Sequence, residues 1–235
     1  MIEAYGQTES TGSSFTTVRN ENRTGYVGGP TVGTEYKLES VHELDYLVTD
    51  QPYPRGEILI RGPGVFKGYF KQPEKTKETI DEDGWLHTGD IGCILENGPL
   101  KIIDRKKNIF KLSQGEYIAP EKIEGIMTNC LYIMQIFVYG DSLKDHVVAV
   151  LIPDEANVMQ LAKEKKWVGD FQTICQSELL HKELEEQMTA MAKMHKLNSL
   201  EQVKGNFVID DTPWTDQDLL TPSMKLKRHA AKEKY

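Results

Sequence analysis

The stretch IIDRKKNIFKLSQGEYIAPEKIE, residues 102–124, marks the point where the character of the chain changes. An apolar run leads into a cluster of cations that begins at Arg105, and a glycine turn at Gly115 precedes a predicted helix start, where Pro120 suits the first helical turn. An arginine can form a forked contact with hydroxyls or phosphate that a solvated lysine cannot. Taken alone, the stretch is also typical of a basic hairpin in solvent.

Upstream of this stretch, the sequence is rich in glycine and turn signals and predicts mostly short strands. The runs at residues 57–61 and 92–95 are apolar or alternating, and glycine, proline and asparagine bound them. One helix is predicted at residues 73–80, because Pro73 suits a first turn and an acidic turn follows.

Downstream, the pattern predicts two apolar strands at residues 133–139 and 146–152, and the second has the continuous apolar character of a strand buried on both faces. Two long helices are predicted next, at residues 155–166 and 171–195. Apolar residues recur every three or four positions in the second helix, which predicts one stripe that packs against its own domain; the stripe consists of Leu180, Leu184, Met188 and Met191.

Composition limits the class of protein. The chain has 235 residues, which allows one or two domains, and it carries 28 Lys and Arg against 36 Asp and Glu, a net charge of −8. With 39% hydrophobic and 27% charged residues, it resembles an ordinary globular chain and not a disordered or fibrous one. The acidic balance disfavours a nucleic-acid surface, because it would repel the phosphate backbone. Only in the basic tail, residues 225–235, are cations segregated from acidic residues.

Cysteine usage and hydropathy point to an intracellular chain. Cys93, Cys130 and Cys175 are far apart and form no metal-binding pattern, so neither a disulfide framework nor a zinc site is expected, and a reducing compartment fits best. No apolar run approaches the length of a membrane helix, and the first residues do not resemble a signal peptide. The sequence therefore predicts no membrane span.

Three further motifs depart from what packing alone requires. YGQTESTG, residues 5–12, is read as a polar loop whose hydroxyls and carboxylate suit phosphate oxygens and hydrated magnesium. In GWLHTGDIG, residues 84–92, Asp90 between close glycines can accept from both hydroxyls of a ribose. LTPSMKLKR, residues 220–228, is a loop that offers Lys225 ahead of a basic helical tail. Each motif also occurs as an ordinary solvated loop, tight turn or helix end.

Together and in order, these motifs resemble one family. YGQTE, GEILIRGPGVFKGYF, GWLHTGDIG, the stretch at 102–124 and LTPSMKLKR are similar to the downstream half of an adenylate-forming acyl-CoA synthetase, of the AMP-binding superfamily. The helical segment ahead of EQVK at residues 201–204 and the ending LTPxxKLKR resemble the long-chain fatty acid branch. Two positions depart from common family members, Asn108 in the basic turn and Met224, where many others have glycine.

The resemblance implies a role for each matching residue. Thr8, Glu9 and Lys225 are the implied catalytic residues, with Glu9 also positioning magnesium and Asp104 serving as a hinge. Tyr5 is expected to stack on adenine, Thr8 to hold phosphate and Asp90 to take the ribose hydroxyls, while Gly115 would line the path of pantetheine. The implied set that binds nucleotide and coenzyme A is Tyr5, Gly6, Gln7, Thr8, Asp90, Arg105, Gly115 and Lys225.

The resemblance also implies a fold and an activity. The expected α/β fold is a mostly β remnant of the large adenylation domain at residues 1–103, followed by a small mobile α+β lid domain at residues 104–235 with a helical insert at about 155–200. ATP, Mg²⁺ and coenzyme A are the implied cofactors and co-substrates of fatty acid activation. The upstream phosphate loop and acyl tunnel of the family are absent, so the chain alone is expected to be inactive.

Two alternatives stay open at this point. The chain could be a non-catalytic accessory or regulatory module that binds nucleotide, or it could belong to an enzyme that adenylates another acid, such as a shorter acyl chain or a hydroxycinnamate. Family members of the long-chain branch are held at the endoplasmic reticulum, the mitochondrial outer membrane or the peroxisome, through segments that lie upstream.

Overall fold

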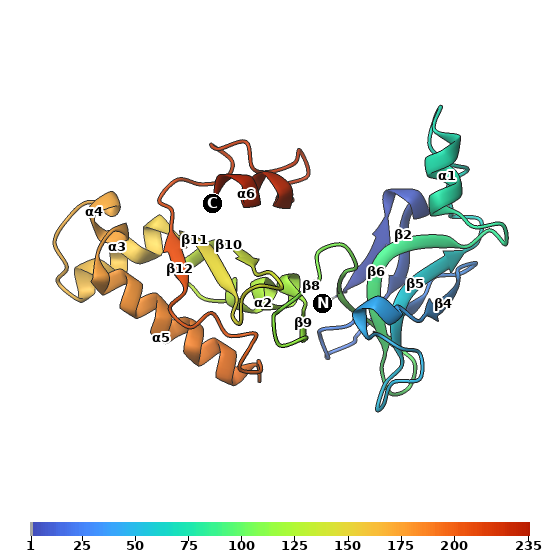
Figure 1. The fold of residues 1–235 in the computed structure, drawn as a ribbon, viewed down its shortest axis with the longest axis horizontal. Helices are drawn as coiled ribbons and strands as arrows, with labels where there is room; N and C mark the ends of the chain where they lie inside the picture. The colour runs from blue at the N-terminus through green and yellow to red at the C-terminus, as the bar shows by residue number, and fades with distance from the viewer. Residues whose placement is uncertain (1) are drawn as a thin grey trace. The chain divides into compact units, whose positions relative to one another are not determined.

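In a computed structural model, which describes residues 2–235, the chain folds as two compact units, Met1–Ile109 and Phe110–Tyr235 (Figure 1). The first unit is mostly β and the second mixes helices with strands, so the architecture is mixed α/β. The division between the units falls after Ile109, six residues beyond the domain boundary expected at residues 103/104. Asp104, the expected hinge, lies inside the first unit.

Two antiparallel sheets form the first unit. One sheet has the order β1-β2-β3, with strands Ala4–Gln7, Gly12–Thr16 and Gly29–Pro30. The other has the order β4-β5-β6-β7, with strands Glu35–Glu39, Arg55–Arg61, Leu86–Ile94 and Leu100–Arg105. Short 3-10 helices, Thr8–Ser10 and His42–Leu44, follow β1 and β4. The strands predicted at residues 57–61 and 92–95 lie in β5 and β6.

The core of the first unit joins the two sheets. Phe15 of β2 is fully buried and packs with Ile58 and Ile60 of β5, Leu86 of β6 and Leu100 of β7. Helix α1 (Pro73–Thr79) begins with proline in its first turn, which confirms the helix predicted from residue 73. The polar loop predicted at residues 5–12 is corrected in part: its first residues belong to β1, because they pair with β2.

A three-stranded sheet lies at the centre of the second unit. Strand β10 (Ile133–Tyr139) pairs antiparallel with β11 (Val148–Pro153), and β12 (Phe207–Ile209) pairs parallel with β11. A small hairpin, β8 (Phe110–Lys111) with β9 (Tyr117–Ile118), leads into helix α2 (Pro120–Met127). The two apolar strands and the helix start at Pro120 are therefore confirmed.

The helical insert consists of α3 (Glu155–Glu164), α4 (Phe171–Cys175) and α5 (Glu178–Met194). The prediction of a single helix at residues 171–195 is wrong, because the helix is interrupted between the end of α4 at Cys175 and the start of α5 at Glu178. The hydroxyl of Ser177 accepts a hydrogen bond from the Leu180 amide at 3.3 Å and so caps the start of α5. A side-chain cap of this kind starts a new helix where periodicity alone suggests continuity.

The apolar stripe of α5 is core, as predicted. Leu180 and Leu184 are fully buried and Met188 nearly so, and Met191 packs against the same cluster with the sheet and α2. Cys130 and Cys175 belong to this core as free thiols. None of the helices within residues 2–235 is long and apolar enough to cross a membrane.

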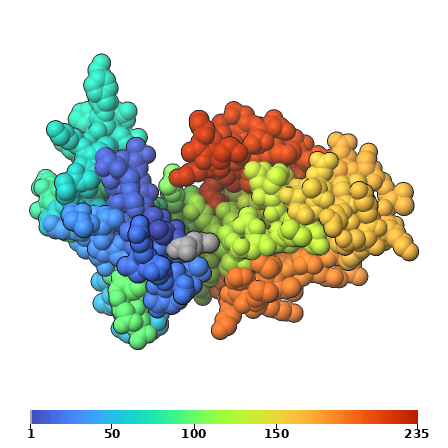
Figure 2. Space-filling view, turned by 180° about the vertical axis from the view of Figure 1, so that it is seen from behind, coloured from blue at the N-terminus to red at the C-terminus, as the bar shows by residue number. Residues whose placement is uncertain are grey.

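Helix α6 (Arg228–Lys234) covers a separate apolar cluster on the sheet of the second unit. Ala231 of α6 is fully buried against residues that include Phe137 and Trp214. Figure 2 shows the C-terminal segment, in red, at the surface of this unit. The segment that offers Lys225 therefore runs between a buried tryptophan and a docked helix.

The stripe of α5 yields a stability prediction. Leu184→Ala removes a fully buried side chain and should lower the free energy of unfolding of the second unit by about 2–5 kcal/mol. Lys182→Ala, on the exposed side of the same helix, is the matched control and should change it by less than about 0.5 kcal/mol. Urea unfolding followed by circular dichroism at 222 nm measures both, and equal effects would contradict this packing.

Candidate functional site

The turn after β1 is built from backbone contacts that only small residues allow. A Cβ atom on Gly6 would lie 1.7 Å from the carbonyl oxygen of Gly12, so glycine is required where β1 meets β2. The amide of Gln7 donates to the Ser10 hydroxyl at 3.1 Å, and this closes the 3-10 turn that holds Thr8 and Glu9. Thr8 is exposed, so its hydroxyl is open to a ligand.

Asp90 is the centre of the polar contacts in the first unit. It lies on β6 and is only 6% exposed. The hydroxyl of Tyr5 donates to its Oδ2 at 2.6 Å, and Nε of Arg105 lies 3.4 Å from its Oδ1. Asp90 and Arg105 are direct cross-strand partners on β6 and β7. The structure thus brings together three of the residues that the motifs singled out.

Burial keeps the Tyr5 hydroxyl protonated, so that it can donate a hydrogen bond. Removal of the phenol from water, together with the negative charge of Asp90, raises the pKa of Tyr5 far above its usual value. The phenol therefore stays protonated at neutral pH and supplies the hydrogen of its bond to Asp90. The Tyr5 ring also lies against Phe15, with ring centroids 6.0 Å apart, which fixes its direction.

Glu9 is held by a residue that the sequence reasoning missed. The hydroxyl of Tyr69 donates to Glu9 Oε1 at 2.6 Å, and the Phe66 amide donates to the Glu9 carbonyl at 2.8 Å. Both partners come from the GPGVFKGYF motif, residues 62–70. The aromatic residues after its glycines were the available signal, but only the fold shows that they lie against Glu9.

Glu57 is a second residue that the sequence reasoning missed. This buried carboxylate accepts from the Gly89 amide at 3.1 Å and from Nζ of Lys106 at 3.3 Å. Lys106 also lies 3.0 Å from Glu43, and although burial opposes it, these two carboxylates raise the pKa of Lys106. Gly89 has φ +70°, a conformation that favours glycine next to Asp90. A single acid inside an apolar strand was the signal for Glu57.

Asp104 lies on β7 beside the Asp90 contacts and is 2% exposed. Its Oδ1 accepts from the Arg105 amide at 2.6 Å, so the carboxylate is bound to the backbone of its own strand. The role of Asp104 as a hinge remains a prediction.

Gly115 and Lys225 belong to the second unit. Gly115 lies in the exposed turn between β8 and β9, where its amide donates to the Leu112 carbonyl at 2.9 Å. Lys225 is exposed on a tight loop, and Met224 beside it has φ +62°, the conformation that glycine adopts readily. That backbone geometry agrees with the glycine that many family members carry at this position.

Comparison with known proteins agrees with the motifs. The family described as AMP-binding enzyme matches residues 1–70. Fatty acyl-CoA synthetase A of Dictyostelium discoideum is 46% identical over 239 residues, which cover 100% of this chain and 36% of that protein. The peroxisomal long chain acyl-CoA synthetase 6 of Arabidopsis thaliana is 44% identical over 236 residues, which cover 100% of this chain and 34% of that protein.

A solved structure matches the fold. The A domain of carboxylic acid reductase from Segniliparus rugosus, in complex with AMP and a co-purified carboxylic acid, has a TM-score of 0.83 at 30% identity, covering 100% of this chain and 34% of that one. The fold is that of part of an adenylation domain, and the family match is to AMP-binding enzymes. Within that class the chain belongs to the long-chain fatty acyl-CoA synthetases, which confirms the resemblance, and it spans about a third of the length of the curated relatives it matches.

The contact between Lys106 and Glu57 yields a prediction for the first unit. Lys106→Met leaves a buried carboxylate without its cation and should lower the free energy of opening of β5 and β6 by about 1–3 kcal/mol. Lys107→Met, at the exposed neighbouring position, should change it by less than about 0.5 kcal/mol. Native-state hydrogen exchange of the β5 and β6 amides measures the difference, and equal exchange in both variants would refute the assignment.

Proposed function

We propose that this chain is the downstream part of an enzyme that activates long-chain fatty acids in two steps. ATP and the fatty acid first give an acyl-adenylate and pyrophosphate, and coenzyme A then displaces AMP to give the thioester. The buried Asp90 carboxylate, held by Tyr5 inside a fold like that of an AMP-bound adenylation domain, is the observation that carries the proposal. The name of the Arabidopsis relative supports a long-chain acid as the substrate.

The first unit would bind the nucleotide. A carboxylate can accept from both hydroxyls of a ribose, and Asp90 would bind the nucleotide in this way. The Tyr5 ring would stack on adenine with Gly6 and Gln7 alongside it, and the exposed Thr8 hydroxyl would bind phosphate. Arg105 would then have two roles. It would hold the Asp90 carboxylate in place, and its positive charge would attract the nucleotide.

Glu9 would hold magnesium. Among residues 2–235 the structure has no group of three or more His, Cys, Asp or Glu side chains arranged to enclose a metal ion. Mg²⁺ does not require such a cage, because it keeps several waters and is bound by one or two carboxylates plus substrate phosphates. A single partly exposed carboxylate, oriented by Tyr69, fits that pattern. When bound, the ion would offset charge on the phosphates.

Lys225 would stabilise the negative charge that builds on the phosphate oxygens during adenylate formation, without transferring a proton. Lys225 lies on a loop of the second unit. If that unit moves between the two half-reactions, Lys225 would be near the phosphates during adenylate formation and away from them during thioester formation. In this proposal the second unit is a mobile lid, Asp104 is the hinge, and Gly115 lines the pantetheine path in the thioester step.

A hybrid enzyme tests the proposed function. In this protein, called the hybrid below, the chain replaces the aligned segment of the Dictyostelium relative. The hybrid should form palmitoyl-CoA from ATP, palmitate and coenzyme A. A folded hybrid that forms no acyl-adenylate would refute the proposal.

The role of Lys225 yields a separate prediction. In the hybrid, Lys225→Ala should slow ATP–pyrophosphate exchange by about 100-fold or more, because a positioned charge is lost, and should leave conversion of supplied palmitoyl-adenylate to the thioester unchanged. Lys232→Ala, at an exposed position of α6 outside the Lys225 loop, is the control. Equal losses in both half-reactions would contradict a role specific to the first step.

The cellular location is part of the proposal. We place the enzyme inside the cell, at the endoplasmic reticulum, the mitochondrial outer membrane or the peroxisome, with membrane association through segments outside this chain. The name of the Arabidopsis relative supports the peroxisome among these locations.

A further inference from the structure

The loop that carries Lys225 is a closed hairpin with a defined shape. Leu220 and Leu226 form an antiparallel bridge, and the Thr221 amide donates to the Lys225 carbonyl at 2.8 Å. The Lys225 amide donates back to the Thr221 hydroxyl at 3.1 Å. These contacts fix the loop internally, but they do not determine in which direction it projects from the second unit.

The ammonium of Lys225 has no ion pair or hydrogen bond with any residue in the part of the chain that the structure describes, residues 2–235. Its position therefore depends on the base of the hairpin. One side of the base is Leu219, which is buried with Trp214 in the apolar cluster under α6. The other side is Arg228, the first residue of α6.

Arg228 ties the base of the hairpin to the centre of the unit. Its guanidinium donates to Glu124 Oε2 on α2, and its Nε lies 3.8 Å from Glu121 on the same helix. The guanidinium also lies over the ring of Phe137, 5.7 Å from the ring centroid. The Arg228 side chain is 20% exposed and that of Glu124 14%, so the contact is largely shielded from water.

Glu124 is itself fixed from a second direction. Its Oε1 accepts from the backbone amide of Val138, near the end of β10, at 2.7 Å. One carboxylate thus joins helix α2, the backbone of the central sheet and the cation at the base of the Lys225 hairpin. Burial raises the pKa of Glu124 to about 7, against the opposing effect of Arg228, so the carboxylate form predominates near pH 8.

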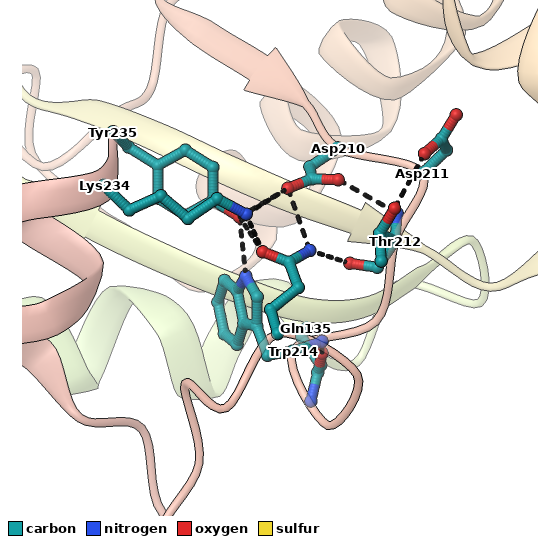
Figure 3. Close-up of polar contacts among 8 residues, drawn as sticks. Gln135, Asp210, Asp211, Thr212, Trp214, Lys234 and Tyr235 are labelled. Atoms are coloured by element: carbon teal, nitrogen blue, oxygen red, sulfur yellow. Dashed lines mark hydrogen bonds and ion pairs between the residues drawn. The ribbon is translucent and has the colours of Figure 1, made fainter.

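The opposite end of α6 is held by separate contacts. Figure 3 shows the ring of Tyr235 beside Trp214 and Asp210, and the Trp214 indole nitrogen donates to the Tyr235 hydroxyl at 3.2 Å. Together with the burial of Ala231, these contacts should keep α6 on the sheet when the Arg228 contact is lost. Loss of the Glu124 contact should therefore free the hairpin without releasing the whole helix.

We propose that Glu124 and Arg228 are positioning residues for Lys225, which fix the direction of its hairpin for adenylate formation. The inference rests on the proposed function of Lys225. Glu124 should affect the rate of adenylate formation only through the position of Lys225. A general role of Glu124 in stability would instead affect both half-reactions. A misplacement of about 1 Å can cost on the order of 100-fold in rate, so a freed hairpin should affect catalysis well before it affects folding.

The kinetic test uses Glu124→Gln in the hybrid near pH 8. ATP–pyrophosphate exchange should fall by about 100-fold, while thioester formation from supplied palmitoyl-adenylate is unchanged. Combined with Lys225→Ala, Glu124→Gln should cause no further loss, because residues that act through one group are not additive. Glu183→Gln, which breaks the buried contact of Glu183 with Lys165 in the helical insert, is the matched control and should spare exchange.

Three results would overturn the inference: equal losses in both half-reactions, a further loss in the Lys225→Ala background, or an equal effect of Glu183→Gln. If Lys225→Ala itself leaves ATP–pyrophosphate exchange intact, the proposed function of Lys225 fails instead.

Amide hydrogen exchange in the 235-residue chain tests the inference independently of activity. The amides of Thr221, Met224 and Lys225 should exchange about tenfold faster in Glu124→Gln and at the unchanged rate in Glu183→Gln. Arg228→Gln replaces Glu124→Gln if the latter does not fold.

Discussion

The antiparallel register of β6 and β7 places Asp90 opposite Arg105, and the proposed nucleotide site depends on this one pairing. The pairing puts a cation against a carboxylate that is only 6% exposed, while Tyr5 approaches the same carboxylate from β1. A buried carboxylate without such partners would lose its charge or destabilise the fold. A slip of one residue would turn Asp90 to the other face of the sheet and separate all three groups.

Two other carboxylates of low exposure are also paired with a cation. Glu57 joins the Gly89 backbone to Lys106 in the first unit, and Glu124 joins the Val138 backbone to Arg228 in the second. In each case a carboxylate accepts from a strand backbone and from a cation that lies far away in the sequence. Such contacts stabilise less than their charges suggest, but they specify one geometry. We propose that these contacts fix the strand that carries Asp90 in the first unit and the hairpin that carries Lys225 in the second.

Local elements could be predicted from the sequence because their signals are local. The strand at residues 133–139, the helix from Pro73 and the stripe of α5 follow from periodicity and proline placement. The break before α5 was missed because the Ser177 cap interrupts an apolar pattern that continues on both sides. Glu9 was recognised but its partner Tyr69, 60 residues away, was not, and Glu124 lies 104 residues from Arg228. Sheet register and helix docking create these contacts, and no short motif encodes them.

The Michaelis constant for ATP in an Asp90→Asn hybrid tests the proposed nucleotide site most directly. An amide keeps the shape of the carboxylate but cannot accept from two ribose hydroxyls while it also faces Tyr5 and Arg105. The account predicts that the Michaelis constant for ATP rises at least about tenfold, the effect of losing a hydrogen bond to a charged group, while that for palmitate stays constant. An unchanged Michaelis constant for ATP together with a lower melting temperature would contradict it, because Asp90 would then serve the fold alone.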